Sequence, residues 1–425
     1  MIFNLGTLER FFLLSSFPKA KRAMSKEVHI VGAGPSGLYC AYLLLENGFE
    51  VHLYDQKSGV GKKFLVAGNG GLNLTHSEDL EKFVEKYGEN TAVFTRLISE
   101  FSPEDLRAWC KGLGVETFIG SSGRVFPKTL KAAQLLSLWL EKLKSSPKFH
   151  LHLKHKLTSI TKDGELSFYV DEKSIDIKTT DTILCLGGGS WKKTGSDGLW
   201  VNFIEKLGVQ VKEFRSMNCG FSTDWSKEFL TGFEDDYLKN IAIEFSNQSI
   251  RGELMLTSYG IEGGGIYAHS SNIQKYLLEN GEAQIFLDLK PSLSREDVLK
   301  KLSKPRGKNS LSNFLRKSLN LSKLSIKLIR ELVSKEECQD QNLLADKIKR
   351  LPITLREARP IDESISTGGG VIFDGLDEDF KVHGTHSIYL IGEMLDWEAP
   401  TGGYLLQGCF SMAHHTSKSI ISKYS

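Results

Sequence analysis

At 425 residues the chain is too long for one compact core, and the usual size of about 100 to 200 residues per domain predicts two or three domains. A composition of 40% hydrophobic and 25% charged residues excludes a disordered or fibrous protein. The formal net charge of +2 excludes a strong overall attraction to nucleic acid or to anionic membranes.

Residues 1–23 contain an apolar patch at residues 11–17, which is shorter than the about 20 residues that span a bilayer. Pro18 and Lys19 follow the patch, where a signal peptide would have a small-residue cleavage site. The segment is poor in acids, so a mitochondrial presequence stays open, but Met24 stands just before the first predicted strand. We interpret residues 1–23 as a disordered extension or a misassigned start, and we expect no membrane-spanning helix.

A glycine-rich turn follows the first predicted strand. The β-branched run at residues 27–31 leads into Gly32, Gly34 and Gly37, and an apolar helical stretch follows at residues 38–45. This order of strand, G-x-G-x-x-G and helix is typical of a dinucleotide-binding unit. The first glycine makes the turn, the second lets the pyrophosphate approach the backbone, and the third lets helix and strand pack closely.

The second predicted strand, residues 50–54, ends at Asp55. An acid about 20 residues after the glycines accepts hydrogen bonds from the ribose hydroxyls and disfavours a ribose 2′-phosphate. These features together predict a bound dinucleotide, but they do not distinguish FAD from NAD.

Later segments favour FAD, which is long enough to need contacts far along the chain. A buried strand at residues 181–186 runs into Gly187 and two further glycines, which leave room beside a flat ligand. Another apolar strand, residues 387–391, ends in Gly392 and Glu393, like the endings that hold the ribityl chain or pyrophosphate in FAD proteins.

Two more segments point the same way. Residues 401–404 precede a helix-like run at residues 405–421, whose N-terminus would stabilise negative charge on a reduced flavin. The glycine-rich stretch at residues 59–75 is predicted to run closely along the cofactor.

In this order, the motifs resemble the BaiN-like, aminoacetone-oxidase-like family of FAD-binding oxidoreductases. The resemblance extends from about Lys26 to the C-terminus and rests on residues 31–37, 59–75 (GVGKKFLVAGNGGLNLT), 121–127 (SSGRVFP), 187–198 (GGGSWKKTGSDG) and 392–407 (GEMLDWEAPTGGYLLQ). It implies an α/β fold with a discontinuous Rossmann-like FAD-binding domain, an inserted domain, and FAD held without a covalent bond.

The motifs and the resemblance together predict one set of cofactor-binding residues. The set is Gly32, Gly34, Pro35, Ser36, Gly37, Asp55, Gln56, Lys63, Asn69, Asn73, Gly187, Gly392, Glu393, Gly402, Gly403, Tyr404 and Leu405. The chain departs from the family at Gly71 and Leu72, where most members have an Arg-Cys pair. A shared cofactor therefore follows more safely than a shared substrate, and oxidation of an aminoketone and reduction of an enone both stay open.

Residues 24–215 and 355–425 are expected to form the FAD-binding domain, and residues 216–354 an inserted substrate or cap domain. The first half of the insert alternates apolar and polar residues, which predicts β-strands. Its second half, residues 295–350, has apolar residues at helical spacing and predicts a helical cap.

Twelve Lys and Arg residues stand within residues 290–330, against only Glu296 and Asp297. Flavoproteins that modify tRNA also combine an FAD domain with a basic insert, so an FAD-containing RNA-binding or tRNA-modifying protein is the alternative function. Phe314 is the only aromatic residue of the stretch, which leaves bases no platform on which to stack. A solvated basic helix face is the simpler interpretation.

The run Gly263-Gly264-Gly265 lacks the dinucleotide spacing and the following acid, so no separate NAD(P)H domain is predicted. NAD(P)H would dock transiently as reductant, unless the substrate itself reduces the flavin. The six cysteines include no CxxC pair and no metal-ligand spacing. They indicate reduced thiols in a cytoplasmic protein, argue against a disulfide reductase, and predict no metal site.

The predicted function is hydride transfer between flavin N5 and a small organic substrate, with the isoalloxazine between the 59–75 loop and the start of the last helix. No general acid or base is identified from the sequence. Tyr404, Asp396 and Arg124 are candidates, although a structural role is the simpler interpretation for each. The same holds for the helix-face pair His414 and His415. No membrane partner is expected, and the sequence indicates no oligomeric state.

Overall fold

The computed structural model describes residues 26–425, so the predicted N-terminal extension lies outside the described residues. Five parallel strands form a central sheet in the order β19-β10-β1-β2-β6. Their bounds are β1 (Glu27–Val31), β2 (Glu50–Asp55), β6 (Phe149–Leu153), β10 (Asp181–Leu184) and β19 (Ile388–Leu390). The predicted α/β class with a Rossmann-like sheet is confirmed.

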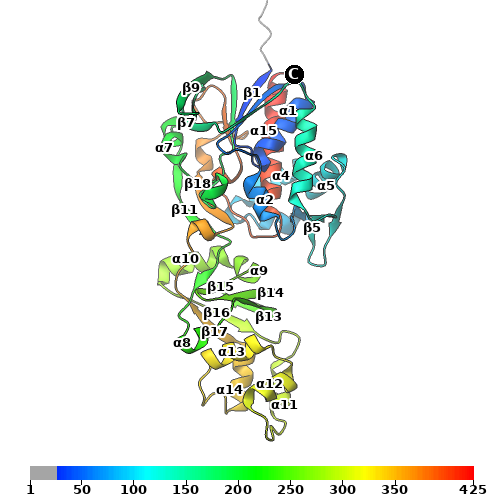
Figure 1. Ribbon diagram of the computed structural model, residues 1–425, viewed down its shortest axis with the longest axis vertical. Coiled ribbons are helices and arrows are strands. Elements are labelled where there is room, and N and C mark those ends of the chain that lie inside the picture. The colour runs from blue at the N-terminus through cyan, green and yellow to red at the C-terminus, as the bar shows by residue number, and fades with distance from the viewer. Residues whose placement is uncertain (1–25) are drawn as a thin grey trace, which may run out of the picture.

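Helices α1 (Pro35–Glu46), α6 (Ala132–Lys144) and α15 (Tyr404–Lys423) lie side by side against this sheet (Figure 1). The successive residues from Val28 to Val31 in β1 are all buried, as expected for a sheet covered on both faces. The other helices of this unit are α2 (Lys62–Ala67), α3 (Leu80–Glu85), α4 (Thr91–Glu100), α5 (Pro103–Gly112) and α7 (Val201–Ile204).

Three small antiparallel sheets complete this unit. The β7–β8–β9 sheet packs against the central sheet, where the rings of Tyr54 and Phe168 stack 4.6 Å apart. The bounds are β7 (Lys156–Ile160), β8 (Glu165–Val170), β9 (Lys173–Lys178), β3 (Thr75–His76), β4 (Thr117–Ile119), β5 (Arg124–Pro127), β11 (Val211–Met217) and β18 (Ser366–Val371).

The middle of the chain forms a second unit below the first in Figure 1. It is built on a six-stranded antiparallel sheet in the order β12-β15-β14-β13-β16-β17. These strands are β12 (Phe221–Ser222), β13 (Asp236–Phe245), β14 (Gln248–Thr257), β15 (Gly260–Glu262), β16 (Ala283–Asp288) and β17 (Leu351–Leu355). The sequence did not indicate β17, which returns to the sheet after the helices.

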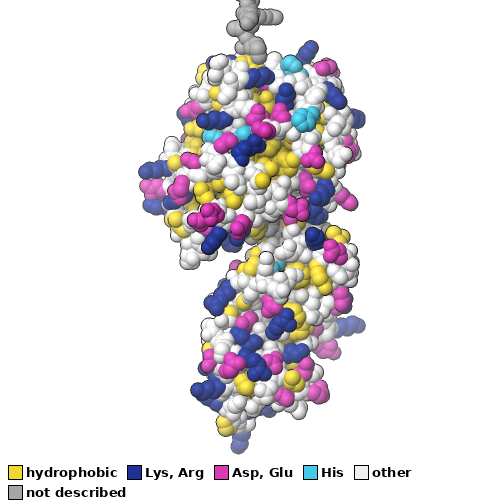
Figure 2. Space-filling view, turned by 180° about the vertical axis from the view of Figure 1, so that it is seen from behind, with side chains coloured by type: hydrophobic (Ala, Val, Ile, Leu, Met, Phe, Trp, Pro, Cys, Tyr) yellow, Lys and Arg dark blue, Asp and Glu magenta, His cyan; other side chains and the backbone are white. Residues whose placement is uncertain are grey.

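Helices occupy the rest of the second unit. They are α8 (Lys227–Leu230), α9 (Gly264–Tyr267), α10 (Ser270–Asn280), α11 (Arg295–Leu302), α12 (Leu311–Leu319), α13 (Lys323–Leu332) and α14 (Gln341–Lys349). The basic segment forms α11, α12 and α13 at the end of the molecule far from the central sheet (Figure 1). Figure 2 shows acidic and basic side chains mixed on the visible face of this end.

Two separate hydrophobic cores accompany the two units, and the core of the second runs from Cys219 to Leu355 with Ala358 packed against it. The sequence-based boundary at residue 216 falls within β11, which pairs with β18 of the first unit. The boundary at residue 354 falls within β17. We therefore propose residues 219–358 as the extent of the inserted unit. Within residues 26–425, no helix is both long enough and apolar enough to cross a membrane.

Candidate functional site

The glycine turn lies between β1 and α1, and different structural features explain why each of its three positions is a glycine. Gly32 has φ +107°, and a Cβ there would lie 2.2 Å from the carbonyl oxygen of Cys185. A Cβ on Gly37 would lie 2.0 Å from the carbonyl oxygen of Gly32. A Cβ on Gly34 would have no atom within 4 Å. Packing therefore requires Gly32 and Gly37, whereas Gly34 leaves its backbone open to a ligand.

The N-terminus of α1 faces the same space without a side-chain cap. Gly34 is the N-cap residue and Pro35 stands in the first turn. The Ser36 hydroxyl donates to the carbonyl of Cys409, 3.3 Å away, and so ties α1 to α15. Because no side chain occupies the helix N-terminus, its free N–H groups and its dipole favour a bound anion.

Asp55 at the end of β2 shapes the glycine turn. Its Oδ2 accepts a hydrogen bond from the Ala33 amide at 2.9 Å, and its Oδ1 accepts one from the Lys57 amide at 2.7 Å. Burial raises the pKa of this carboxyl above its ordinary value. Each carboxylate oxygen has a second lone pair, so these bonds leave acceptors for a ribose hydroxyl.

The turn after β10 closes another side of the site. Gly187 has φ +73°, and a Cβ there would lie 2.9 Å from the Ser196 hydroxyl. The Trp200 indole donates to the Gly187 carbonyl at 2.8 Å. Gln56 donates its side-chain amide to the Gly195 carbonyl at 2.7 Å. The end of β2 is thus bound to a segment about 140 residues later in the chain.

A charged pair lies deeper in the site, between α2 and the 3-10 turn Gly392–Met394. The Lys63 ammonium is 2.7 Å from Oε2 of Glu393 and donates to the buried Ser190 hydroxyl, also at 2.7 Å. Oε1 of Glu393 accepts a hydrogen bond from the Thr367 amide at 3.2 Å. The side chains of Lys63 and Glu393 are 25% and 16% exposed, so solvent screens this pair less than a surface pair.

These groups surround one cavity of about 410 Å³ at the carboxyl ends of the central strands. The predicted residues that line it are Gly32, Gly34, Pro35, Ser36, Asp55, Gln56, Lys63, Gly187, Gly392 and Glu393. Its charged residues are Lys62, Lys63, Lys156, Lys206, Asp55, Asp197 and Glu393. The excess of lysine suits a ligand with a negatively charged diphosphate.

The remaining predicted residues lie outside the lining of this cavity, namely Gly37, Asn69, Asn73, Gly402, Gly403, Tyr404 and Leu405. The amide of Asn73 donates to the carbonyls of Thr75 and Val125, at 2.8 and 3.1 Å, and so ties the 59–75 loop to β5. A Cβ on Gly403 would lie 2.5 Å from the Thr75 Cα. The structure therefore brings Thr75 of the 59–75 loop into direct contact with Gly403 at the start of α15, whereas the sequence placed the isoalloxazine between these two segments.

Tyr404 opens α15, which has no side-chain cap at its N-terminus. Its hydroxyl donates to Oε1 of Glu78, and its ring stacks on His76 with centroids 5.5 Å apart. Burial is the main reason that the pKa of Tyr404 lies above its usual value, and the Glu78 carboxylate raises it further.

A second cavity of about 820 Å³ lies between the two units. It is lined by Tyr404 and Thr401, by the turn after α3, by β11, and by β14, α9 and α10 of the inserted unit. Trp397 lines this cavity and donates its indole N–H to the carbonyl of Gly392, which lines the first cavity, at 2.8 Å. The turn at residues 392–397 is therefore the wall between the two cavities.

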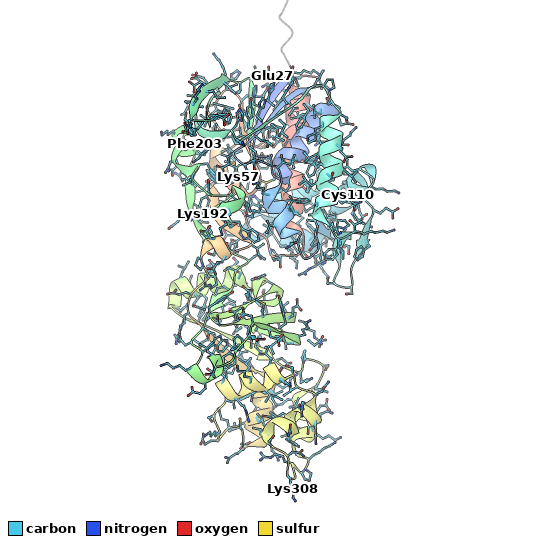
Figure 3. The ribbon with its side chains drawn as sticks, viewed as in Figure 1. Glu27, Lys57, Cys110, Lys192, Phe203 and Lys308 are labelled. Carbon is cyan, nitrogen blue, oxygen red and sulfur yellow. The ribbon has the colours of Figure 1, made fainter. Side chains whose placement is uncertain are left out.

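Sequence reasoning missed several residues that line the first cavity. They include His155, Thr158, Trp200 and Phe203, the last of which is labelled in Figure 3. None stands in a glycine motif, so no local signal marked them. Cys185 and Cys409 also line this cavity, and burial raises the pKa of both thiols, that of Cys409 to about 12. Both are therefore neutral thiols at neutral pH.

The other sequence candidates lie elsewhere. Asp396 lines the second cavity, and its Oδ2 is 3.2 Å from the Lys212 ammonium. The guanidinium of Arg124 reaches to within 3.9 Å of a Cβ built on Gly264 in the inserted unit.

Both helix-face histidines have structural partners. His414 stacks on Phe101 with centroids 4.9 Å apart. His415 lies 2.8 Å from a carboxylate oxygen of Glu100 and 3.2 Å from one of Asp379.

Close packing explains why the run at residues 263–265 of the inserted unit consists of glycines. A Cβ on Gly265 would lie 2.4 Å from the Ile243 side chain and 2.7 Å from the Glu253 carbonyl oxygen. The run lets α9 approach the sheet closely and does not line the first cavity.

Residues 26–419 match the family described as HI0933-like protein Rossmann domain. The chain is 24% identical over 414 residues to the 3-dehydro-bile acid delta(4,6)-reductase of Clostridium scindens, which covers 91% of this chain and 97% of the relative. It is also 24% identical over 403 residues to the ribosomal RNA dihydrouridine synthase of Haemophilus influenzae, covering 92% of this chain and 97% of the relative.

Two solved structures share the fold. An open flavocytochrome c3 fumarate reductase has a TM-score of 0.50 at 14% identity, covering 94% of this chain and 78% of that chain. The 3-ketosteroid-delta4-(5alpha)-dehydrogenase of Rhodococcus jostii RHA1 has a TM-score of 0.50 at 12% identity, covering 93% of this chain and 97% of that chain.

Proposed function

The chain belongs to the HI0933-like Rossmann family and is an FAD-dependent oxidoreductase, and we propose that it reduces a carbon–carbon double bond conjugated to a carbonyl group in a small organic molecule. The names of two relatives support this reaction class. A delta(4,6)-reductase of a 3-dehydro-bile acid acts on double bonds beside a ketone, and a dihydrouridine synthase saturates the ring double bond of uridine. At a double bond directly conjugated to the carbonyl, such as the delta-4 bond of a 3-ketone or the ring double bond of uridine, a hydride adds to the β carbon and a proton to the α carbon.

The residues of the first cavity fit FAD. The observation that carries this assignment is the open backbone at Gly34 beside an uncapped helix N-terminus, because packing alone gives no reason for glycine there. Gly32, Gly34, Pro35 and Ser36 would hold the pyrophosphate, and Asp55 the adenosine ribose.

At the other end of the cofactor, Glu393 would accept from the ribityl hydroxyls, and Lys63 would hold that carboxylate in place. Bound FAD supplies a hydride donor and acceptor at N5, without a covalent link to the chain. The uncapped start of α15 would stabilise negative charge on the reduced ring.

The second cavity is the proposed substrate site. It lies between the two units and reaches Tyr404, next to the turn that separates it from the first cavity. We propose Tyr404 as the donor of the proton to the α carbon, because it lines this cavity and its hydroxyl, which here donates to Glu78, would turn toward a bound substrate. The Glu78 carboxylate would then accept a proton from solvent and return it to the tyrosine oxygen.

NADH or NADPH is the proposed reductant, docking transiently at the cofactor. Packing explains why Gly265 is a glycine, so the run that most resembles a second dinucleotide-binding turn needs no bound NAD(P)H to account for it. This supports a reductant that docks only transiently.

The test uses the purified FAD-containing chain under anaerobic conditions. NADH or NADPH should bleach the flavin, and 2-cyclohexen-1-one should reoxidise it with formation of cyclohexanone. A colourless protein that takes up no FAD would overturn the cofactor assignment. If NAD(P)H reduces the flavin and oxygen reoxidises it, but enones do not, the substrate class alone is overturned.

A ribosomal RNA substrate is the second candidate. Two relatives named ribosomal RNA dihydrouridine synthase, from Haemophilus influenzae and Escherichia coli, favour it, as does the basic segment at the end of the inserted unit. Lys304, Arg306 and Lys308 are all exposed in the turn between α11 and α12, and Figure 3 labels Lys308 at the far end of the molecule.

This candidate predicts salt-sensitive binding of a ribosomal RNA transcript. A triple substitution of these three residues to Gln should weaken that binding and leave enone reduction unchanged. Exposed Lys173 and Lys178, substituted to Gln on β9 of the first unit, provide the control. Equal RNA binding by both variants would argue against the basic segment as an RNA site.

A further inference from the structure

A row of histidines crosses three neighbouring parallel strands of the central sheet. His29 of β1 is in register with His52 of β2, which is in register with His150 of β6. The ring centroids are 4.9 Å apart for the first pair and 4.5 Å for the second. Because backbone register and not a loop fixes these side chains, their arrangement is held by the most rigid part of the fold.

Two carboxylates flank this row. Glu27 and Glu50 are themselves in register and stand two positions before His29 and His52, so they share the same sheet face. Oε1 of Glu50 accepts from Nε2 of His150 at 2.8 Å. One possible donor atom each of Glu50, His52 and His150 lies within 4.8 Å of the other two.

We propose that Glu50, His52 and His150 bind one Zn²⁺ ion, with water at the fourth position. Two imidazole nitrogens and one carboxylate oxygen form a ligand set that zinc accepts in tetrahedral geometry. In tetrahedral geometry, ligand atoms about 2.0 to 2.2 Å from the metal lie about 3.3 to 3.6 Å from one another. The candidate ligand atoms lie within 4.8 Å of one another, so the outermost side chains would move by roughly 1 Å, and Zn²⁺ would replace the proton between Glu50 and His150.

The surroundings favour a cation at this position. Nδ1 of His52 is 3.1 Å from Nε2 of His152, which orients the ring as a second hydrogen-bonding group commonly does for a metal ligand. The Glu27 carboxylate adds a second negative charge, with Oε1 3.5 Å from Nε2 of His52.

Solvent reaches the site from the sheet edge. The side chains become more exposed along the row, from 21% for His52 to 37% for His150 and 51% for Glu50. β6 is the edge strand of the central sheet, so an ion can enter beside it.

The site is separate from the flavin chemistry. None of its three ligands lines either cavity. His52 stands three residues before Asp55 on β2, or about 10 Å along the strand. Figure 3 labels Glu27 at the top of the molecule and Lys57, just beyond the end of β2, nearer the middle. The inference therefore does not rest on the proposed function.

Isothermal titration with ZnCl₂ tests the site. The FAD-containing chain, produced without an affinity tag, is treated with EDTA, desalted and titrated. One equivalent should bind, and the thermal unfolding midpoint should rise on zinc addition, because a ligand that binds only the folded chain stabilises it.

Three variants make the result specific. His52→Gln combined with His150→Gln should abolish both the binding and the rise in the unfolding midpoint. Glu50→Gln keeps the size of the side chain and should weaken binding by at least about tenfold. His383→Gln combined with His386→Gln, at two exposed histidines outside the row, should bind zinc as the parent does. The cysteines are unchanged in all three, so binding by thiols would persist in every variant.

Absence of a saturable one-to-one site in the parent, or unchanged affinity in both the double variant and Glu50→Gln, would overturn the proposal. Far-UV circular dichroism and flavin content report on folding. Should the double variant lose its fold, the Glu50→Gln affinity decides.

Discussion

The two cavities of this protein differ in the residues that line them. Glycine turns and a helix N-terminus form much of the cavity at the strand ends. Charged side chains of both signs line both cavities, but the cavity between the units has a single glycine in its lining, Gly88, where the first cavity has seven. A backbone-lined site recognises a ligand by close approach and N–H groups, whereas a side-chain-lined site changes its preference with single substitutions. This difference supports the assignment of cofactor to the first cavity and substrate to the second.

The largest effect is expected where two glycines of the same turn are compared. Gly32→Ala should destabilise the chain by several kcal/mol, since a strained φ and an overpacked atom each cost about 1 to 3 kcal/mol. Gly34→Ala should leave the stability of the FAD-free chain unchanged, because its Cβ meets no protein atom, and should weaken FAD binding. Thermal unfolding without FAD and a fluorescence titration with FAD separate the two outcomes. A large loss of stability in FAD-free Gly34→Ala would contradict the distinction between packing and ligand glycines.

Tyr404→Phe tests the link between the two cavities. If Tyr404 donates the proton to the substrate, this variant should slow flavin reoxidation by an enone by about 100-fold. Reduction of the flavin by NAD(P)H should be unaffected, since it needs no proton from this residue. Stopped-flow absorbance measures both half-reactions. Tyr237→Phe, at a tyrosine 45% exposed in the inserted unit, is the control. Equal slowing of both half-reactions would point to a structural role for Tyr404.

A smaller effect is expected at Arg215, which lines the cavity between the units and pairs with Glu398 at 2.8 Å. Arg215→Met should raise KM by about tenfold, because a hydrogen bond to a charged group contributes a binding free energy of this order. The kcat should change little. FAD content should stay at the parent value. Steady-state kinetics with the same enone provide the measurement, and Arg356→Met, at an exposed arginine of the second unit, provides the comparison. Loss of flavin from Arg215→Met would contradict the assignment of Arg215 to a substrate site that is separate from the cofactor site.

The smallest effect concerns pH. Burial raises the folded-state pKa of Asp55 above the ordinary value of 3.8. Between these two pKa values the folded chain holds a proton that the unfolded chain has lost, so the contribution of Asp55 to stability falls as pH rises through this window. Asp55→Asn cannot ionise.

The free energy of unfolding of the parent minus that of Asp55→Asn should therefore fall with rising pH just above 3.8, by at most about 1.4 kcal/mol per pH unit. Urea unfolding of the FAD-free chains at a series of pH values measures this difference. A difference that rises with pH would mean that the hydrogen bonds from Ala33 and Lys57 outweigh burial.

The sequence predicted the first unit better than the second. The strand, glycine turn and helix at residues 27–46 are local, and the structure forms them where the pattern placed them. The insert has strands at the three places where the sequence placed them and helices within residues 295–350, but α10, which lies among the strands, and β17 were missed. The five residues of β17 alternate apolar and less buried positions, but the run is short and contains Pro352, and its partner β16 precedes it by more than 60 residues.

The candidate site shows the same division. Gly34 and Asp55 followed from spacing along the chain. The partners of Lys63 did not, because Ser190 and Glu393 stand 127 and 330 residues away. Asn73 was predicted to bind the cofactor, and in the structure its side-chain nitrogen donates to two backbone carbonyls. Similarly, no spacing rule joins His52 to His150, which only the register of β2 with β6 brings together.

By itself, therefore, the sequence determined the α/β class and the nucleotide turn, because hydrophobic periodicity and glycine spacing act over a few residues. Tertiary structure alone decided which charges pair inside the first cavity, that a second cavity lies between the units, and that histidines align across the sheet. Those features depend on strand register and on packing between distant segments, where the energy of a contact does not depend on how far apart its residues lie in the chain.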